Sequence, residues 1–240
     1  MREKIIAGNI YHILNRGVDK RKIFLDDEDR LRFIHDLFEF NDIESINNLT
    51  YYFRRTQYKD IECPYIVKTK EKRQRKLLVH ILAFCLMPNH YHLLIKPLSN
   101  DGISKFMKKL NMGYSKYFNE KYQRNGTLFE GRYKSVVIKH DSHFIHIPYY
   151  IHLNPLDLSM PNWRKKEAGN YKKAIKFLEN YRWSSFQDYI GKKNFPSLTQ
   201  RELLLNSFEG STNYKKETMK WLEERNIEEI KDVILERIIE

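Results

Sequence analysis

The sequence has no long apolar run, few cysteines and a deficit of acidic relative to basic residues. No apolar stretch approaches the roughly 20 residues that a membrane-spanning helix needs. The first residues, Met1-Arg2-Glu3-Lys4, lack the apolar centre of a signal peptide. These absences argue against a transmembrane helix and against secretion, and we expect a cytoplasmic protein.

Cysteine is represented only by Cys63 and Cys85, which lie far apart and fit no zinc-binding spacing. In a cytoplasmic protein such a pair is expected to remain as reduced thiols. The sequence also contains no internal repeat. We therefore expect neither a disulfide framework nor a repeat architecture, and we assign the cysteines no role.

Positive charge is what the sequence has in excess. Lysine and arginine total 43 against 31 aspartates and glutamates, a net charge of +12. This excess favours a polyanionic partner such as nucleic acid, with an anionic membrane surface as the competing target. The 16 tyrosines and 14 phenylalanines are interleaved with basic residues, as where bases stack on rings, although most are expected in the core.

The first half of the chain predicts a strand and a helix, followed by an insertion. β-forming residues over 5–15 end at the turn signal Asn15-Arg16-Gly17. Asp26 or Asp27 is placed to cap a helix whose apolar positions recur at helical spacing. From about 42 to 76 the pattern becomes polar and basic, and we predict an inserted loop region.

The second half predicts a hairpin, a basic amphipathic helix, a strand and a further helix. In order, these are strands over 77–87 and 90–95 separated by Pro88-Asn89, a helix over 101–122, a strand over 127–138, and a helix from Asp141 toward Asn154, which Pro148 would kink or start later.

This order of elements suits an α+β fold with an antiparallel sheet and helices packed on one face. We expect one catalytic domain over 1–160. Residues 161–240 read as a basic, helical C-terminal extension, with a charged helical tail over 215–239.

Two histidines stand one residue apart in the second strand of the predicted hairpin. Because side chains alternate along a strand, His90 and His92 share a face and can chelate one cation, while Tyr91, Leu93 and Ile95 face the core. Taken alone, such a pair more often has no metal role.

A second pair of residues gives the histidines a use. Tyr150 and Asn154 are four apart, so on a helix they lie on one face. A tyrosine can attack a phosphodiester if the phosphate is held and its charge is neutralised. The Asn154 amide oxygen could complete a site with the two imidazoles, a ligand set that suits Mg²⁺ or Mn²⁺, whereas imidazoles alone would suit zinc better. Without the histidines, Tyr150 would be read as a core aromatic.

Several segments together resemble a known family. They are Tyr11-His12-Ile13-Leu14-Asn15-Arg16-Gly17, Met87-Pro88-Asn89-His90-Tyr91-His92-Leu93-Leu94, Gly126-Thr127-Leu128-Phe129-Glu130-Gly131-Arg132-Tyr133-Lys134-Ser135, Tyr150-Ile151-His152-Leu153-Asn154-Pro155 and Tyr181-Arg182-Trp183-Ser184-Ser185. In this order they resemble the HUH-type single-tyrosine transposases, particularly the REP-associated tyrosine transposases, over roughly residues 5 to 190.

The resemblance implies a ferredoxin-like or RRM-like fold and a substrate of single-stranded or hairpin DNA. It implies a divalent cation held by His90 and His92, with Asn154 as third ligand. Tyr150 would become linked to the 5′ phosphate and leave a free 3′ hydroxyl. Tyr149 is the fallback nucleophile, about 100° around the helix axis from Tyr150 and off the face shared with Asn154.

The sequence departs from the family at two places near the tyrosine. Pro148 stands where an ordinary helical residue is expected, and Leu156-Asp157-Leu158 replaces the basic Val-Arg-Ala that commonly follows Asn-Pro. These departures bear on the helix geometry and on nearby DNA contacts. The group that removes the proton of Tyr150 is not identified, and His152 is expected to serve packing.

Six basic residues are the candidates for contacts with the DNA backbone, because phosphate neutralisation needs cations and tolerates approximate spacing. They are Arg16, Lys105, Lys108, Lys109, Arg132 and Lys134. Two of them, Arg132 and Lys134, are expected to share one strand face.

Two other functions stay open at this point. A non-catalytic RRM-like nucleic-acid binder would need only basic and aromatic residues, and a metal-dependent phosphodiesterase would use water in place of tyrosine. The sequence does not distinguish a monomer from a homodimer.

Overall fold

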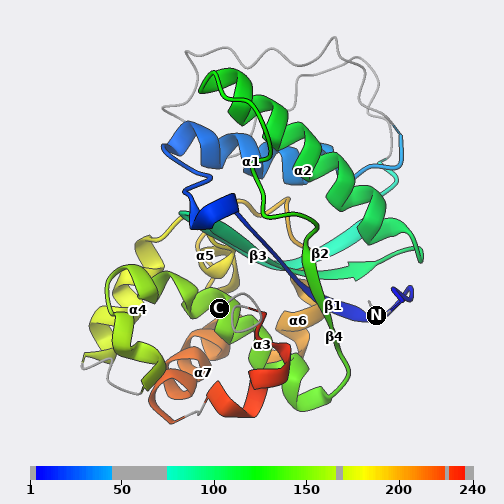
Figure 1. Ribbon diagram of the computed structural model, residues 1–240. Helices are drawn as coiled ribbons and strands as arrows, with labels where there is room; N and C mark the ends of the chain where they lie inside the picture. The colour runs from blue at the N-terminus through cyan, green and yellow to red at the C-terminus, as the bar shows by residue number, and fades with distance from the viewer. Residues whose placement is uncertain (1–3, 45–74, 166–169, 225–226, 236–240) are drawn as a thin grey trace.

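The centre of the computed structural model is a four-stranded antiparallel sheet (Figure 1). The structure describes residues 4–44, 75–165, 170–224 and 227–235. The strands are β1 (Ile10–Arg16), β2 (Val79–Met87), β3 (His90–Pro97) and β4 (Lys134–Ile138), in the spatial order β2-β3-β1-β4. The predicted α+β fold with an antiparallel sheet is confirmed.

The hairpin of β2 and β3 forms as expected. Met87 pairs with His90 across the tight turn at Pro88-Asn89, where the proline cannot continue the ladder. β1 then pairs with β3, so that Arg16 lies opposite His90 and Leu14 opposite His92. Directly opposed residues share a face of the sheet, which brings the end of β1 beside the histidines.

Two helices, α1 (Asp27–Glu39) and α2 (Gly102–Lys121), cover one face of the sheet (Figure 1). Asp26 caps α1 as predicted, because its carboxylate accepts a hydrogen bond from the Asp29 N–H at 2.9 Å. The buried core on this face includes Phe33, Phe106 and Tyr91.

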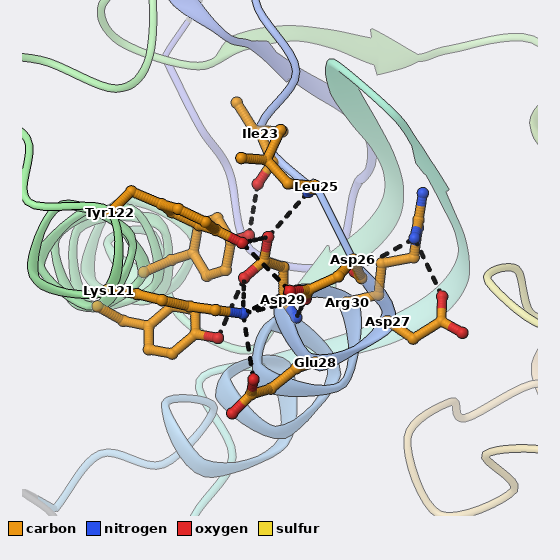
Figure 2. A network of polar contacts seen from close by, with 11 residues as sticks. Ile23, Leu25, Asp26, Asp27, Glu28, Asp29, Arg30, Lys121 and Tyr122 are labelled. Atoms are coloured by element: carbon orange, nitrogen blue, oxygen red, sulfur yellow. Dashed lines mark hydrogen bonds and ion pairs between the residues drawn. The ribbon is translucent and has the colours of Figure 1, made fainter.

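A polar network ties the end of α2 to the start of α1 (Figure 2). The Lys121 ammonium lies 2.8 Å from Asp26 Oδ2, 3.2 Å from Glu28 Oε2 and 2.8 Å from Asp29 Oδ1. The Tyr122 hydroxyl also donates to Asp29 Oδ2 at 2.8 Å. Since Asp29 is fully buried, the lysine provides the countercharge that its carboxylate needs.

The other face of the sheet is covered as well, by α3 and the elements after it (Figure 1). These are α3 (Asp141–Leu153), the 3-10 helices η4 (Asn154–Leu158) and η5 (Pro161–Lys165), α4 (Tyr171–Asn180), α5 (Phe186–Tyr189), α6 (Glu202–Leu205), the 3-10 helix η6 (Asn206–Phe208), α7 (Ser211–Glu224) and the 3-10 helix η7 (Ile227–Val233). A further 3-10 turn, η1 (Val18–Lys20), follows β1. A second buried core joins Leu94 of β3 to Ile147 of α3, Leu178 of α4 and Tyr214 of α7. The prediction that helices pack on one face holds for α1 and α2. It missed the additional layer that α3 and the extension form on the other face.

Several predicted boundaries were wrong. β1 begins at Ile10, not at residue 5, and β4 begins at Lys134, not at residue 127. Gly131, with φ +144°, interrupts the extended backbone before β4. Arg132 therefore lies outside the strand and does not share a strand face with Lys134.

The helix around Pro148 is continuous. α3 runs from Asp141 to Leu153 with Pro148 inside it, so the proline neither ends the helix nor resets its start. In the charged helical tail predicted over 215–239, the described residues include the end of α7 and the 3-10 helix η7. No described helix is long and apolar enough to cross a membrane.

Two sequence predictions fall largely outside the described residues. The insertion predicted at about 42–76 includes residues 45–74, and Cys63 lies among them. Cys85 is a buried thiol in β2.

Candidate active site

The two histidines of β3 point to the same face, as predicted. The His90 and His92 ring centroids are 5.0 Å apart with the rings nearly perpendicular. Tyr91 points the other way, is fully buried, and packs 4.8 Å from the ring centroid of Phe33 in α1. The imidazoles thus face the layer formed by α3 and the extension.

The helix α3 places Tyr150 against His92. The Tyr150 ring centroid is 6.0 Å from that of His92, at an interplanar angle of 90°. One turn later, the Asn154 side chain donates from Nδ2 to the Tyr150 carbonyl oxygen at 2.9 Å. His92, Tyr150 and Asn154 are all fully buried. The helix and the strand predicted to carry the site therefore meet.

The fallback nucleophile Tyr149 points into a different environment. Its ring packs against Tyr214 at 5.2 Å, Phe208 at 5.2 Å and Trp221 at 6.2 Å between centroids. Burial, together with the charge of Glu217, raises the pKa of the Tyr149 hydroxyl well above its usual value. This geometry supports Tyr150 over Tyr149.

A third histidine, His12 of β1, belongs to the same cluster. It is fully buried, and its Nε2 lies 2.9 Å from His92 Nδ1. Its Nδ1 lies 2.7 Å from the carbonyl oxygen of Val233 in η7. The segment around His12 contributes to the family resemblance, but we predicted no role for His12 itself. Its contact with His92 depends on the pairing of β1 with β3, which are far apart in the sequence.

The hydrogen bonds of His12 determine the tautomers. A carbonyl oxygen only accepts, so His12 Nδ1 donates to Val233. In a neutral His12, Nε2 is then the acceptor and His92 Nδ1 carries a proton. In a neutral His92, Nε2 is consequently the ring nitrogen with the lone pair that a cation needs.

The donor set fits a divalent cation in part. His90 Nδ1 lies 2.7 Å from Asn89 Oδ1, so both histidines have Nδ1 held by a neighbour, the arrangement common for metal-binding imidazoles. The Asn154 Oδ1 accepts from Arg164 at 2.7 Å, but an amide oxygen has a second lone pair. Over the described ranges no three His, Cys, Asp or Glu side chains come together as a metal site. A site here would therefore rest on imidazole and amide ligands.

Arg164 is a second residue that sequence reasoning did not identify. It comes from η5 and donates from Nη1 to the Tyr150 hydroxyl at 3.1 Å as well as from Nη2 to Asn154. Ten residues separate it from Asn154, and only the path of η4 and η5 brings it back. Nothing in the sequence distinguishes this arginine from the other basic residues as a contact of Tyr150 and Asn154.

His152 is structural, as expected. Its Nδ1 lies 2.6 Å from the Tyr214 hydroxyl and its Nε2 2.7 Å from Ser185 Oγ. Burial lowers the pKa of His152 to about 3. Ser185 also accepts a hydrogen bond from the Phe84 N–H at 2.9 Å. The histidine thus connects α3 to β2 and to α7, which fixes the helix that carries Tyr150.

The predicted DNA contacts fall into two groups. Arg16, Arg132 and Lys134 line a cavity of about 220 Å³ at the sheet edge, where Arg16 pairs with Glu130 at 2.9 Å. Lys105, Lys108 and Lys109 lie on α2, across the sheet from the histidines. Lys105 pairs with Asp101 at 2.6 Å, and Lys109 donates to the Asp42 carbonyl oxygen at 2.5 Å. Only the first group is near His90.

Comparison with protein families identifies the central part of the chain. Residues 50–154 match the model of the family described as IS200-like transposases. This matched segment is similar to IS200-like transposases. The resemblance to tyrosine transposases is thereby confirmed, and with it the enzyme class.

The matched segment contains His90, His92 and Tyr150 and ends at Asn154. It includes neither His12 nor Arg164, although both contact the site. No curated protein matches the sequence. A solved REP-associated tyrosine transposase bound to a REP hairpin is 15% identical, with 82% of this chain and 87% of that chain covered and a TM-score of 0.49. A likeness of this degree carries no argument about function.

Proposed function

We propose that the protein is a metal-dependent single-stranded DNA endonuclease and strand transferase that works through a 5′-phosphotyrosine intermediate. The observation that carries this proposal is the position of Tyr150, which faces His92 from α3 with Asn154 one turn away. A tyrosine beside an imidazole that could bind a cation is placed to attack a phosphate that the cation holds. The resemblance to REP-associated transposases makes hairpin DNA the first substrate to test.

His90, His92 and Asn154 are the residues that we propose to hold the cation. Imidazole and amide oxygen ligands suit Mn²⁺ or Mg²⁺. When bound, the cation would supply Lewis-acid stabilisation and orient the scissile phosphate. The protein's part is to fix the imidazoles, which the hydrogen bonds from Asn89 and His12 do.

The covalent step needs no reactant other than the DNA, Tyr150 and water. The Tyr150 oxygen forms a bond to phosphorus and releases its proton to water, while the bond from phosphorus to the 3′ oxygen breaks. That oxygen takes up a proton and leaves as a 3′ hydroxyl. The phosphotyrosine conserves the bond energy, so a 3′ hydroxyl can attack it and rejoin the strand.

Positive charge at the sheet edge is proposed to hold the DNA next to the cleavage centre. Arg16, Arg132 and Lys134 line one cavity beside the histidine-bearing end of β3. Phosphate contacts of this kind position the strand without reading its sequence. The α2 lysines, on the other side of the sheet, remain a prediction for a more distant part of the DNA. We propose that this activity takes place in the cytoplasm.

The domain boundary at residue 160 also remains a proposal, with one modification. Residues 1–160 contain the histidines and the tyrosine, but Arg164 and Val233 of the extension reach them. We therefore propose that the extension contributes to the active site and is not only an appendage.

The geometry does not favour the two alternatives. An RRM-like binder presents stacking aromatics on an open sheet face. Here one face is covered by α1 and α2 and the other by α3 and the extension. A phosphodiesterase that uses water would give no role to the contact between Tyr150 and His92.

Trapping the intermediate tests the proposed function. The protein is incubated with single-stranded hairpin oligonucleotides and Mn²⁺ or Mg²⁺, and the products are separated in denaturant. We expect a protein–DNA adduct that EDTA prevents and that Tyr150→Phe abolishes, while Tyr149→Phe, the matched control, retains it. Cleavage without any adduct would contradict the proposal and favour attack by water, and binding without cleavage would favour the non-catalytic binder.

A further inference from the structure

Arg164 is held in a fixed plane by Asp157. Its Nε donates to Asp157 Oδ1 at 3.1 Å and its Nη2 to Asp157 Oδ2 at 2.6 Å. This two-bond pairing is the geometry in which a guanidinium is most restricted. The Trp163 indole also donates to Asp157 Oδ1 at 2.6 Å, so the carboxylate itself is anchored.

Two further N–H groups of the guanidinium point at the two candidate site residues of α3 and η4. Nη1 donates to the Tyr150 hydroxyl at 3.1 Å, and Nη2 donates to Asn154 Oδ1 at 2.7 Å. The guanidinium carbon is 5.1 Å from the Tyr150 ring centroid. One cation thus contacts both the proposed nucleophilic oxygen and a proposed ligand oxygen.

This contact has a chemical consequence for the attack. Because the Tyr150 oxygen accepts from Arg164, its own proton points away from the guanidinium and toward another acceptor. Negative charge gathers on the phosphate oxygens as the tyrosine oxygen bonds to phosphorus. A fixed guanidinium beside that oxygen is preorganised to stabilise this charge.

We propose that Arg164 is a catalytic residue, which positions the Tyr150 oxygen for attack and stabilises the charge of the transition state. This inference rests on the proposed function. Asp157 is the positioning residue, because it acts only through Arg164.

The departure from the family at Asp157 fits this assignment. The sequence Leu156-Asp157-Leu158 stands where a basic residue is common after Asn-Pro. In this chain η5 folds back on η4 and supplies a cation, Arg164, which pairs with Asp157 at that position. Since the matched segment ends at Asn154, the family assignment includes neither residue.

The test compares the parent with Arg164→Ala in single-turnover adduct formation with a hairpin oligonucleotide and Mn²⁺. We expect the rate of adduct formation to fall by about 10²- to 10³-fold, the usual effect of removing one preorganised donor. Hairpin affinity should change little, because the proposed phosphate contacts lie elsewhere. The conservative variant Arg164→Lys should retain part of the rate, since an ammonium keeps the charge but not the planar fork.

Chemical rescue separates catalysis from structure. The Arg164 side chain is 25% exposed, so a small guanidinium ion can reach the space left in the alanine variant. Millimolar guanidinium should raise the rate of Arg164→Ala by roughly tenfold or more, whereas ammonium at the same concentration should not, because only guanidinium has the planar fork. Asp157→Asn should lower the rate less than Arg164→Ala does.

The outcomes are distinguishable from failure of the proposed function. If the parent forms no adduct linked to Tyr150, the proposed function fails and the role of Arg164 with it. If the parent forms the adduct and Arg164→Ala matches its rate, only the role of Arg164 is overturned. A slow variant that guanidinium does not rescue would also overturn it, since the loss would then be structural. If Arg164→Ala does not fold, Arg164→Lys decides: a lowered rate at unchanged hairpin affinity would support the role, and an unchanged rate would contradict the need for the fork.

Discussion

His12 Nε2 lies 2.9 Å from His92 Nδ1, inside a cluster where both rings are fully buried. The contact joins β1 to β3, the strand that carries His90 and His92. Because His12 Nδ1 donates to the carbonyl oxygen of Val233, His92 is the donor in the hydrogen bond between the two histidines. It leaves His92 Nε2 as the nitrogen that would bind a cation.

Removal of His12 should weaken cation binding without removing a ligand. We expect His12→Ala to lower the affinity for Mn²⁺ by about 10- to 100-fold, the usual cost of losing a group that orients a metal-binding histidine. Calorimetric titration with Mn²⁺ measures this. His140→Ala is the matched control, because His140 is exposed at the start of α3. Equal affinities for the parent and His12→Ala would show that the hydrogen bond has no part in cation binding.

Stability at acid pH should depend on Asp26. Burial alone would raise its pKa, but the Lys121 ammonium and the Asp29 N–H outweigh burial, and the pKa of Asp26 is lowered. A lowered folded-state pKa means that stability is present above the unfolded value of 3.8 and is lost as the pH falls through the folded value. The unfolding free energy of the parent should therefore fall more steeply below about pH 5 than that of Asp26→Asn.

The substitutions at this position separate charge from capping. Asparagine caps a helix as well as aspartate, so Asp26→Asn removes only the charge, whereas Asp26→Ala should cost about 1 kcal/mol more at pH 7 through loss of the cap. Urea unfolding at pH values from about 3 to about 7, which span the titration of the carboxyl group, measures both effects. Parallel pH profiles for the parent and Asp26→Asn would contradict the charge argument.

The two basic surfaces should differ in their effect on DNA binding. Lys134→Ala should weaken hairpin binding and reduce the slope of log affinity against log salt by about 0.7, the value for one phosphate contact on single strands. Lys108→Ala is the matched control, exposed like Lys134 but on α2 across the sheet. We expect a smaller change for it. Fluorescence anisotropy at several salt concentrations measures both slopes, and a larger effect at Lys108 would move the DNA to the face of α2.

Local patterns predicted the parts of the site that depend on one element. The period of a strand put His90 and His92 on one face, and a capping aspartate marked the start of α1. Both follow from backbone geometry over a few residues. The prediction that Tyr91 faces the core is confirmed for the same reason.

Contacts between residues far apart in the sequence could not be predicted from those local patterns. His12 and His92 meet because β1 lies between β3 and β4, an order that no local signal specifies. Arg164 reaches Tyr150 through the turns of η4 and η5. We expected Pro148 to kink the helix or to make it start later, but the helix continues through it because packing of α3 on the sheet outweighs one lost backbone hydrogen bond.

Identification of the residue that carries the DNA tests the central claim most directly. The adduct formed with a hairpin oligonucleotide and Mn²⁺ is digested with nuclease and protease, and the modified peptide is sequenced by mass spectrometry. We predict a nucleotide linked through its 5′ phosphate to Tyr150. A link to Tyr149 or to any other residue, or cleaved DNA with no modified peptide, would contradict the account.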